Sequence, residues 1–145
     1  MKAVVQRVSY ASVSVNGEVK GKIERGIVVL VGISETDNSK TIRWIANKLV
    51  NLRIFPDENE KMNLSVKDID GWILLIPNFT VYGDIRNGFR PSYSKSAVPD
   101  LSEPLFNELL NVLNNIYHKV ESGIFGAMME VALLNNGPVT IIIEK

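Results

Sequence analysis

Side chains that could carry out chemistry are concentrated in two segments, IPNFTVYGDIRNGFRPSY and NNGPVT. In the first, Thr80 is the one hydroxyl placed directly after a predicted buried strand, and further polar side chains follow: Arg86, Arg90, Ser92 and Tyr93. Backbone N–H groups at a strand end, with cations nearby, suit a phosphate, a carboxylate or a developing oxyanion. The alternative from the residues alone is a strand end followed by an ordinary surface loop.

The second segment places Asn136, Gly137 and Pro138 ahead of a β-branched run. Glycine tolerates positive φ and lets another backbone come close, whereas proline fixes φ and has easy access to a cis peptide bond. Turn chemistry alone favours a tight turn that leads into a terminal strand. A segment whose backbone serves a function is the alternative.

The common catalytic side-chain sets are missing from the sequence. There is no cysteine, and the single histidine, His118, follows a predicted helix where a helix-end cation is the commoner role. Without them, neither Ser-His-Asp nor Cys-His-Asn can form. The acidic residues of FPDENEK are typical of a solvated turn, and no phosphate-binding or dinucleotide glycine motif occurs. We therefore expect neither a metal nor another cofactor.

Length and charge restrict the class of protein further. The chain has 145 residues, which favours one domain spanning 1–145. Sixteen Lys and Arg balance sixteen Asp and Glu, so we expect no DNA partner, and any polyanion must be bound locally. The first residues lack the apolar run of a signal peptide, and no window approaches the ~18 apolar residues of a membrane span. These features predict a soluble cytoplasmic protein with no membrane partner.

The elements that would position the two segments are strands and two helices. Residues Lys2–Ile33 predict three antiparallel strands, with turns at Asn16-Gly17 and Arg25-Gly26. Apolar spacing then predicts a helix of about 14 residues around Ile42–Leu52, capped by one of three side chains: Thr36, Asp37 or Ser39.

The second half returns to strands around one more helix. A strand through Phe55, a buried strand Trp72–Ile76 and a loop from Thr80 to Pro99 precede the second helix, with Pro104 expected in its first turn. Two final strands, GIFGAMMEVALL and PVTIIIEK, would be joined by the Asn-Gly-Pro turn. The order favours an α+β fold, with a curved, mostly antiparallel sheet covered by two helices.

At this point the whole chain resembles the D-aminoacyl-tRNA deacylase family, formerly called D-tyrosyl-tRNA deacylases. The resemblance rests on MKAVVQRVSYASV, LRIFPDENEKMN, FRPSY, GIFGAMM and the family's NGPVT signature, intact at Asn136–Thr140. The other family signature, S-Q-F-T-L, reads Pro77-Asn78-Phe79-Thr80-Val81 here. Chemistry that needs the family's serine hydroxyl therefore cannot apply. A related deacylase family with a different chiral tolerance has proline at that position.

The resemblance implies a barrel-like sheet, a homodimer with shared active sites, and hydrolysis of the ester that joins a D-amino acid or glycine to tRNA. It implies backbone oxyanion stabilisation at Phe79 and Thr80, assisted by the RNA 2′-hydroxyl and without a cofactor. Thr80 as a nucleophile is the alternative, and a positioning role is favoured because the sequence identifies no base to deprotonate it. It further implies that a cis Gly137-Pro138 peptide enters the partner's active site and excludes L-amino acids. Glycyl-tRNA mischarged on tRNA-Ala would escape this filter.

The resemblance also assigns roles to further residues. Asn78, Asn136 and Met129 would contact the substrate, although core packing is an equal alternative for Met129. Arg7 would support the Gly-Pro segment. The tRNA contacts would include Arg86 and Arg90, extended by three cations for which surface solvation is an equal alternative: Lys20, Lys22 and Arg25.

Three hypotheses follow from the sequence. The first is a dimeric D-aminoacyl-tRNA deacylase, with strict or with relaxed chiral specificity. The second is a non-catalytic tRNA-binding dimer on the same fold, suggested by the altered PNFTV segment. The third is a small-ligand-binding α+β protein in which Asn-Gly-Pro is no more than a turn.

Overall fold

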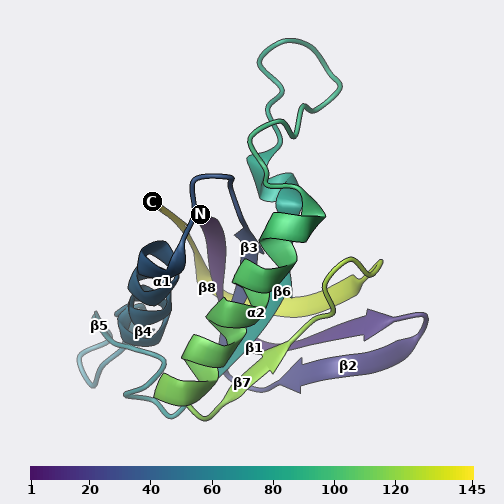
Figure 1. Cartoon of the computed structure of the whole chain (residues 1–145). Helices are drawn as coiled ribbons and strands as arrows, with labels where there is room; N and C mark the ends of the chain where they lie inside the picture. The colour runs from purple at the N-terminus through teal and green to yellow at the C-terminus, as the bar shows by residue number, and fades with distance from the viewer.

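The computed structural model describes residues 1–145, in which a curved, barrel-like sheet is covered by two helices (Figure 1). In chain order the elements are β1 (Lys2–Val15), β2 (Glu18–Ile23), β3 (Gly26–Gly32), α1 (Ser39–Asn51), β4 (Phe55–Pro56), β5 (Met62–Leu64), β6 (Trp72–Pro77), the 3₁₀ helix η1 (Phe79–Tyr82), α2 (Pro99–Ile116), β7 (Val120–Ser122) and β8 (Glu130–Glu144). This arrangement confirms the predicted α+β class. No helix is both long and apolar enough to cross a membrane.

The long strand β1 organises the sheet, because β2, β3 and β8 all pair with it in antiparallel fashion. The pairs Lys2–Gly32 and Ala11–Ile23 belong to the same register, so β3 and β2 follow one another along one edge of β1. Strand β8 occupies the other edge. Strands β3, β6 and β7 extend the sheet through parallel pairings.

Of the two turns predicted near the N-terminus, one is confirmed and one is wrong. Asn16 and Gly17 have φ of 51° and 80° and join β1 to β2, as expected of a two-residue hairpin turn. At Arg25-Gly26 the chain instead bends at Glu24 and Arg25 and continues from β2 into β3 along the same edge of β1. Glycine is needed there for close approach, since a Cβ on Gly26 would lie 2.0 Å from the carbonyl oxygen of Trp72 in β6.

The predicted pair of C-terminal strands is a single strand, β8, interrupted by a bulge. Asn135 pairs with Val8 and Thr140 pairs with Gln6, so residues 136–139 bulge out opposite the single residue Arg7. The prediction that Asn-Gly-Pro forms a turn between two strands is therefore wrong, because the chain does not reverse its direction there. Both halves of β8 run along the same partner, and a bulge of this kind re-aims the backbone without ending the strand.

Both helices lie near their predicted positions, but their first turns differ from the prediction. Asn38 caps α1, because its Oδ1 accepts the Lys40 and Thr41 backbone N–H groups. The neighbouring Asp37 is unavailable, since its carboxylate accepts from the Met1 ammonium and the Ser34 backbone N–H.

In α2 the first-turn proline is Pro99, whereas Pro104 lies inside the helix. The expectation for Pro104 is therefore wrong.

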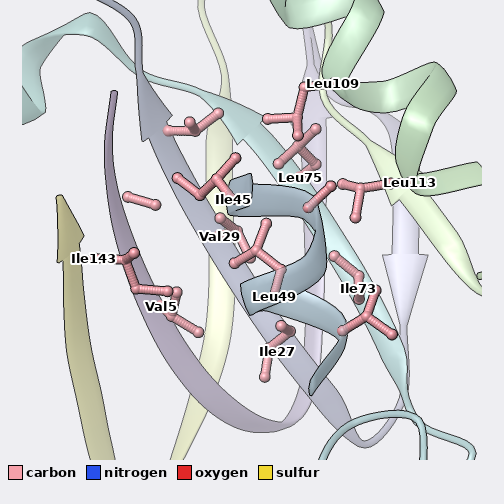
Figure 2. Packing of buried hydrophobic residues seen from close by; sticks show 14 of the residues in the cluster. Val5, Ile27, Val29, Ile45, Leu49, Ile73, Leu75, Leu109, Leu113 and Ile143 are labelled. Carbon is pink, nitrogen blue, oxygen red and sulfur yellow. The ribbon is translucent and has the colours of Figure 1, made fainter. Parts of the chain in front are cut away.

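The core has two parts, on the two faces of the sheet. The larger part is covered by α1 and α2, and Ile45, Leu49, Leu109 and Leu113 reach from these helices onto the sheet (Figure 2). A smaller cluster on the other face includes the following residues: Val8, Ala11, Val13, Ile23, Val28, Leu74 and Ile76. Strands β3 and β6 contribute to both parts, which explains their unbroken apolar sequences.

Candidate functional site

The first chemical segment starts where β6 ends and the short helix η1 begins. The Asn78 backbone N–H donates to the Val31 carbonyl at 2.8 Å, which holds this segment against β3. The Asn78 side-chain oxygen accepts from the Thr80 backbone N–H at 3.1 Å and from the Thr80 hydroxyl at 2.5 Å. The Thr80 hydroxyl proton thus points to an amide oxygen, which cannot remove it as a base would.

Close packing onto β3 fixes the position of η1. A Cβ on Gly32 would lie 2.4 Å from Cγ2 of Val81, so only glycine lets η1 approach this closely. On its outer side, Phe79 is 56% exposed, and its ring makes an edge-to-face contact with Tyr93, with ring centroids 5.0 Å apart. The helix therefore presents Phe79 and Thr80 at the surface, with the Phe79 ring packed against Tyr93 of the following loop.

Met129 lies beside the same strand end. A Cβ on Gly123 would lie 2.6 Å from the Met129 sulfur and 3.6 Å from Cδ of Pro77, so both side chains border one glycine. Met129 also packs against the smaller core cluster. It can therefore line the surface near Asn78 while it contributes to packing.

The second chemical segment is the bulge of β8, which Arg7 holds in place. The Arg7 Nε donates to the Asn136 carbonyl at 3.1 Å, and its Nη1 donates to the Ile54 carbonyl at 2.6 Å. The Asn136 amide donates to the Ser9 hydroxyl at 3.1 Å. Gly137 has φ of 125°, and its peptide bond to Pro138 is cis. Burial, and secondarily the charge of Arg25, lower the pKa of Arg7.

A single chain does not bring the two segments together. The segment at Asn78 lies at the end of β3, where Gly32 pairs with Lys2. The bulge lies opposite Arg7, five residues further along β1. At about 3.3 Å per residue, this separation is roughly 17 Å. Thr80 and Gly137 therefore cannot act on one small group within the same chain.

The predicted tRNA-contacting arginines lie on the segment between η1 and α2, which projects from the body of the fold (Figure 1). Arg86 Nε donates to both carboxylate oxygens of Asp84, at 2.9 and 3.0 Å. This pairing holds the pKa of Asp84 well below its usual value and raises the pKa of Arg86. Arg90 is exposed and makes no ion pair.

His118 and Asp57, two further residues considered from the sequence, make contacts of a structural kind. His118 is 74% exposed, follows the end of α2 and lies 3.6 Å from Asp70. Asp57 organises the FPDENEK segment by accepting from the Asn59 and Lys61 backbone N–H groups, which confirms the predicted turn. No three acidic or histidine side chains are grouped to hold a metal ion.

Known proteins match this chain over its full length. The family model for D-Tyr-tRNA(Tyr) deacylase matches residues 4–144. A D-aminoacyl-tRNA deacylase from Thermosipho africanus is 52% identical over all of this chain and 97% of its own length. A second, from Desulfatibacillum aliphaticivorans, is 50% identical over all of this chain and 99% of its own.

Solved structures agree on the fold. The c-Myc DNA Unwinding Element Binding Protein superposes with a TM-score of 0.95 at 40% identity, covering 100% of this chain and 99% of its own. A probable eukaryotic D-amino acid tRNA deacylase has a TM-score of 0.84 at 15% identity, covering 98% and 97%. The fold and the sequence together place the chain in the class of tRNA deacylase proteins. It belongs to the D-Tyr-tRNA(Tyr) deacylase family, as the resemblance predicted.

Two features of the site were missed from the sequence. The first is the capping role of Asn78, although Asn is one of the preferred residues at the N-cap of a helix. The second is the contact of Tyr93 with Phe79, for which the sequence holds no local signal, because a loop brings the two rings together.

Proposed function

We propose that this chain hydrolyses the ester bond of D-aminoacyl-tRNA and releases the free amino acid and tRNA. The observation that carries the proposal is the match to relatives named D-aminoacyl-tRNA deacylase at about half identity over the whole chain. The substrate is the aminoacylated 3′ end of a tRNA. Such an ester is already activated, so the enzyme needs chiefly to orient it and to stabilise an oxyanion.

The proposed catalytic groups are the backbone of Phe79 and Thr80, with Asn78 in support. Asn78 uses its side-chain oxygen to hold Thr80, which leaves its amide N–H donors without a partner in the chain. These donors suit the ester carbonyl or the oxyanion that forms from it. Thr80 acts as a positioning residue, and the substrate's own 2′-hydroxyl assists the attack by water.

The proposed active unit is a homodimer in which each bulge completes the partner's site. The separation of Thr80 from Gly137 within one chain supports this arrangement, because a second copy can supply the missing segment. Strand β8 pairs on one edge only, and it exposes three large apolar side chains: Leu134, Ile141 and Ile142. An unpaired, apolar edge of this kind favours association.

Carbonyl groups of the Gly137-Pro138 segment would hold the α-amino group and leave no space on the L side of the α-carbon. Selection against L-amino acids would thus depend on the backbone of the bulge and not on contacts with the amino acid's side chain. One site would therefore accept many different D-amino acids. Glycyl esters, including glycine mischarged on tRNA-Ala, would also be accepted because glycine has no side chain to exclude. We place the enzyme in the cytoplasm, where aminoacyl-tRNA is used.

The decisive experiment follows release of amino acid from D-tyrosyl-, L-tyrosyl- and glycyl-tRNA, with a chelator present throughout. We expect rapid loss of the D-tyrosyl and glycyl esters and retention of the L-tyrosyl ester. If both tyrosyl esters are hydrolysed, the chain is a deacylase of relaxed specificity and does not discriminate between D- and L-amino acids. An intact D-ester at high enzyme concentration, with tRNA still bound, would favour the non-catalytic tRNA-binding dimer.

A matched variant tests the altered signature. The double substitution Pro77→Ser with Asn78→Gln restores the residues that the resemblance places before Phe79 and Thr80. If Pro77 and Asn78 relax chiral selection, this variant will discriminate D from L esters more strongly than the natural chain. An unchanged ratio would assign selection to the bulge alone.

A further inference from the structure

We infer that the pocket beneath the β8 bulge is a binding site for a phosphate group. The pocket has a volume of about 250 Å³ and is lined by Arg7, Val8, Ser9, Arg25, Phe55, Pro56 and Asn136. A single water molecule needs only about 10 to 15 Å³ of such space, so a phosphate fits with part of its hydration shell. The inference concerns binding and does not depend on whether the chain hydrolyses esters.

The charge of the pocket is uncompensated. Arg7 and Arg25 both line it, and no carboxylate does. The charge of Arg25 contributes to the lowered pKa of Arg7, so the two guanidinium groups repel one another across the pocket. A bound anion would remove this repulsion. Arginine pairs are suited to phosphate, because the planar guanidinium can donate two parallel hydrogen bonds.

The pocket also has hydrogen-bond donors that the fold does not use. Arg25 makes no side-chain hydrogen bond or ion pair, and its guanidinium lies 5.7 Å from the centre of the buried Phe55 ring. Arg7 uses Nε and Nη1 for backbone carbonyls, which leaves Nη2 free. The Ser9 hydroxyl accepts from Asn136 and keeps its own proton for donation.

Binding at this pocket would act directly on the bulge. Arg7 touches the pocket and donates to the Asn136 carbonyl, and Asn136 is itself part of the lining. An anion held by both arginines would therefore fix Arg7 and, through it, the segment that includes Gly137. The phosphate could belong to an RNA backbone or be free in solution, and the chemistry that binds it is the same.

The test measures binding of inorganic phosphate to the full-length protein by titration calorimetry at constant ionic strength. We expect saturable binding that Arg25→Gln weakens by about tenfold, the effect of one lost charge-assisted hydrogen bond. Arg43→Gln is the matched control, because Arg43 is an exposed arginine on α1 outside the pocket. Phosphate should also shift the NMR signals of the Arg7 and Arg25 Nε–H groups.

A second titration distinguishes the source of the phosphate. If Arg25→Gln weakens binding of an unacylated RNA hairpin that ends in CCA, the pocket holds an RNA phosphate. If it weakens inorganic phosphate alone, the ligand is a free phosphate. The inference is overturned if the natural chain shows no saturable phosphate binding, or if Arg43→Gln weakens binding as much as Arg25→Gln.

Discussion

Replacement of Gly137 by alanine tests whether the bulge depends on both its backbone conformation and its contact with Arg7. Gly137 has φ of 125°, where an L side chain is strained. A Cβ at this position would also lie 2.7 Å from Nη2 of Arg7 and 2.9 Å from Cγ2 of Val139. The substitution therefore combines backbone strain with a steric clash against the residue that holds the bulge.

The two effects can be separated with a control substitution at another glycine that has nearly the same backbone conformation. Gly88 has φ of 120°, and nothing lies within 4 Å of the position that an alanine methyl group would take there. Gly88→Ala should thus report strain alone, at about 1 kcal/mol for an exposed segment. Gly137→Ala should cost about 2 kcal/mol, because overpacking against Arg7 and Val139 adds at least as much.

The assay is thermal unfolding at one fixed protein concentration, since association would otherwise change the apparent stability. For a chain of this length, about 2 to 4 °C of Tm is lost per kcal/mol. We expect a loss of about 4 to 8 °C for Gly137→Ala and about half of that for Gly88→Ala. Hydrolysis of D-tyrosyl-tRNA should fall strongly in Gly137→Ala even below its Tm.

A double-mutant cycle completes the test. Arg7→Ala removes the clash with Nη2, leaves the one with Val139 and also removes the support for Asn136. Gly137→Ala should therefore cost less in that background than in the natural chain. Equal losses of Tm in Gly137→Ala and Gly88→Ala would refute the clash. Full deacylase activity in Gly137→Ala would refute the proposed role of the bulge.

Three further predictions concern η1 and the loop that follows it. Gly32→Ala should destabilise the fold by about 1 to 3 kcal/mol, measured by urea unfolding, because its Cβ would lie 2.4 Å from Val81. Thr80→Val should lower kcat/KM for D-tyrosyl-tRNA by about tenfold through loss of one hydrogen bond, whereas loss of a nucleophile would cost on the order of 10⁵-fold or more. NMR titration should find the pKa of Asp84 well below the usual value of an aspartate, and Arg86→Gln should raise it. Because the folded-state pKa is the lower one, the Asp84–Arg86 pair stabilises the fold above about pH 4, and this contribution is lost as the pH falls through the folded-state value.

The sequence predicts the elements well where their signals are local. The apolar runs of β3 and β6 indicate strands buried on both faces, and both faces are indeed covered. The Asn16-Gly17 dipeptide indicates a turn because its backbone requires positive φ at both residues. The spacing of apolar residues likewise places α1 and α2. In each case the residues that carry the signal lie close together in the sequence.

Two of the wrong predictions share a cause, which is that one residue type serves several purposes. A glycine beside a strand signals a turn, but Gly26 is required because the backbone of Trp72 approaches it from another strand. Asp37 is a good capping residue, but the Met1 ammonium already binds its carboxylate. In both cases the deciding partner is more than thirty residues away, so local sequence could not identify it.

The bulge in β8 is the clearest example of this limit, and it is also where function is proposed. Asn136-Gly137-Pro138 interrupts a strand, and the local residues are equally compatible with a reversal of direction. The outcome is decided by β1, which pairs with β8 on both sides of the interruption and leaves Arg7 opposite four residues. Because Arg7 binds the carbonyl of Asn136, the surplus backbone is held in one conformation. In the proposed function, this fixed backbone segment would recognise the substrate through its carbonyl groups, so a chain with one histidine and no cysteine would not need a catalytic side chain of either type to be selective.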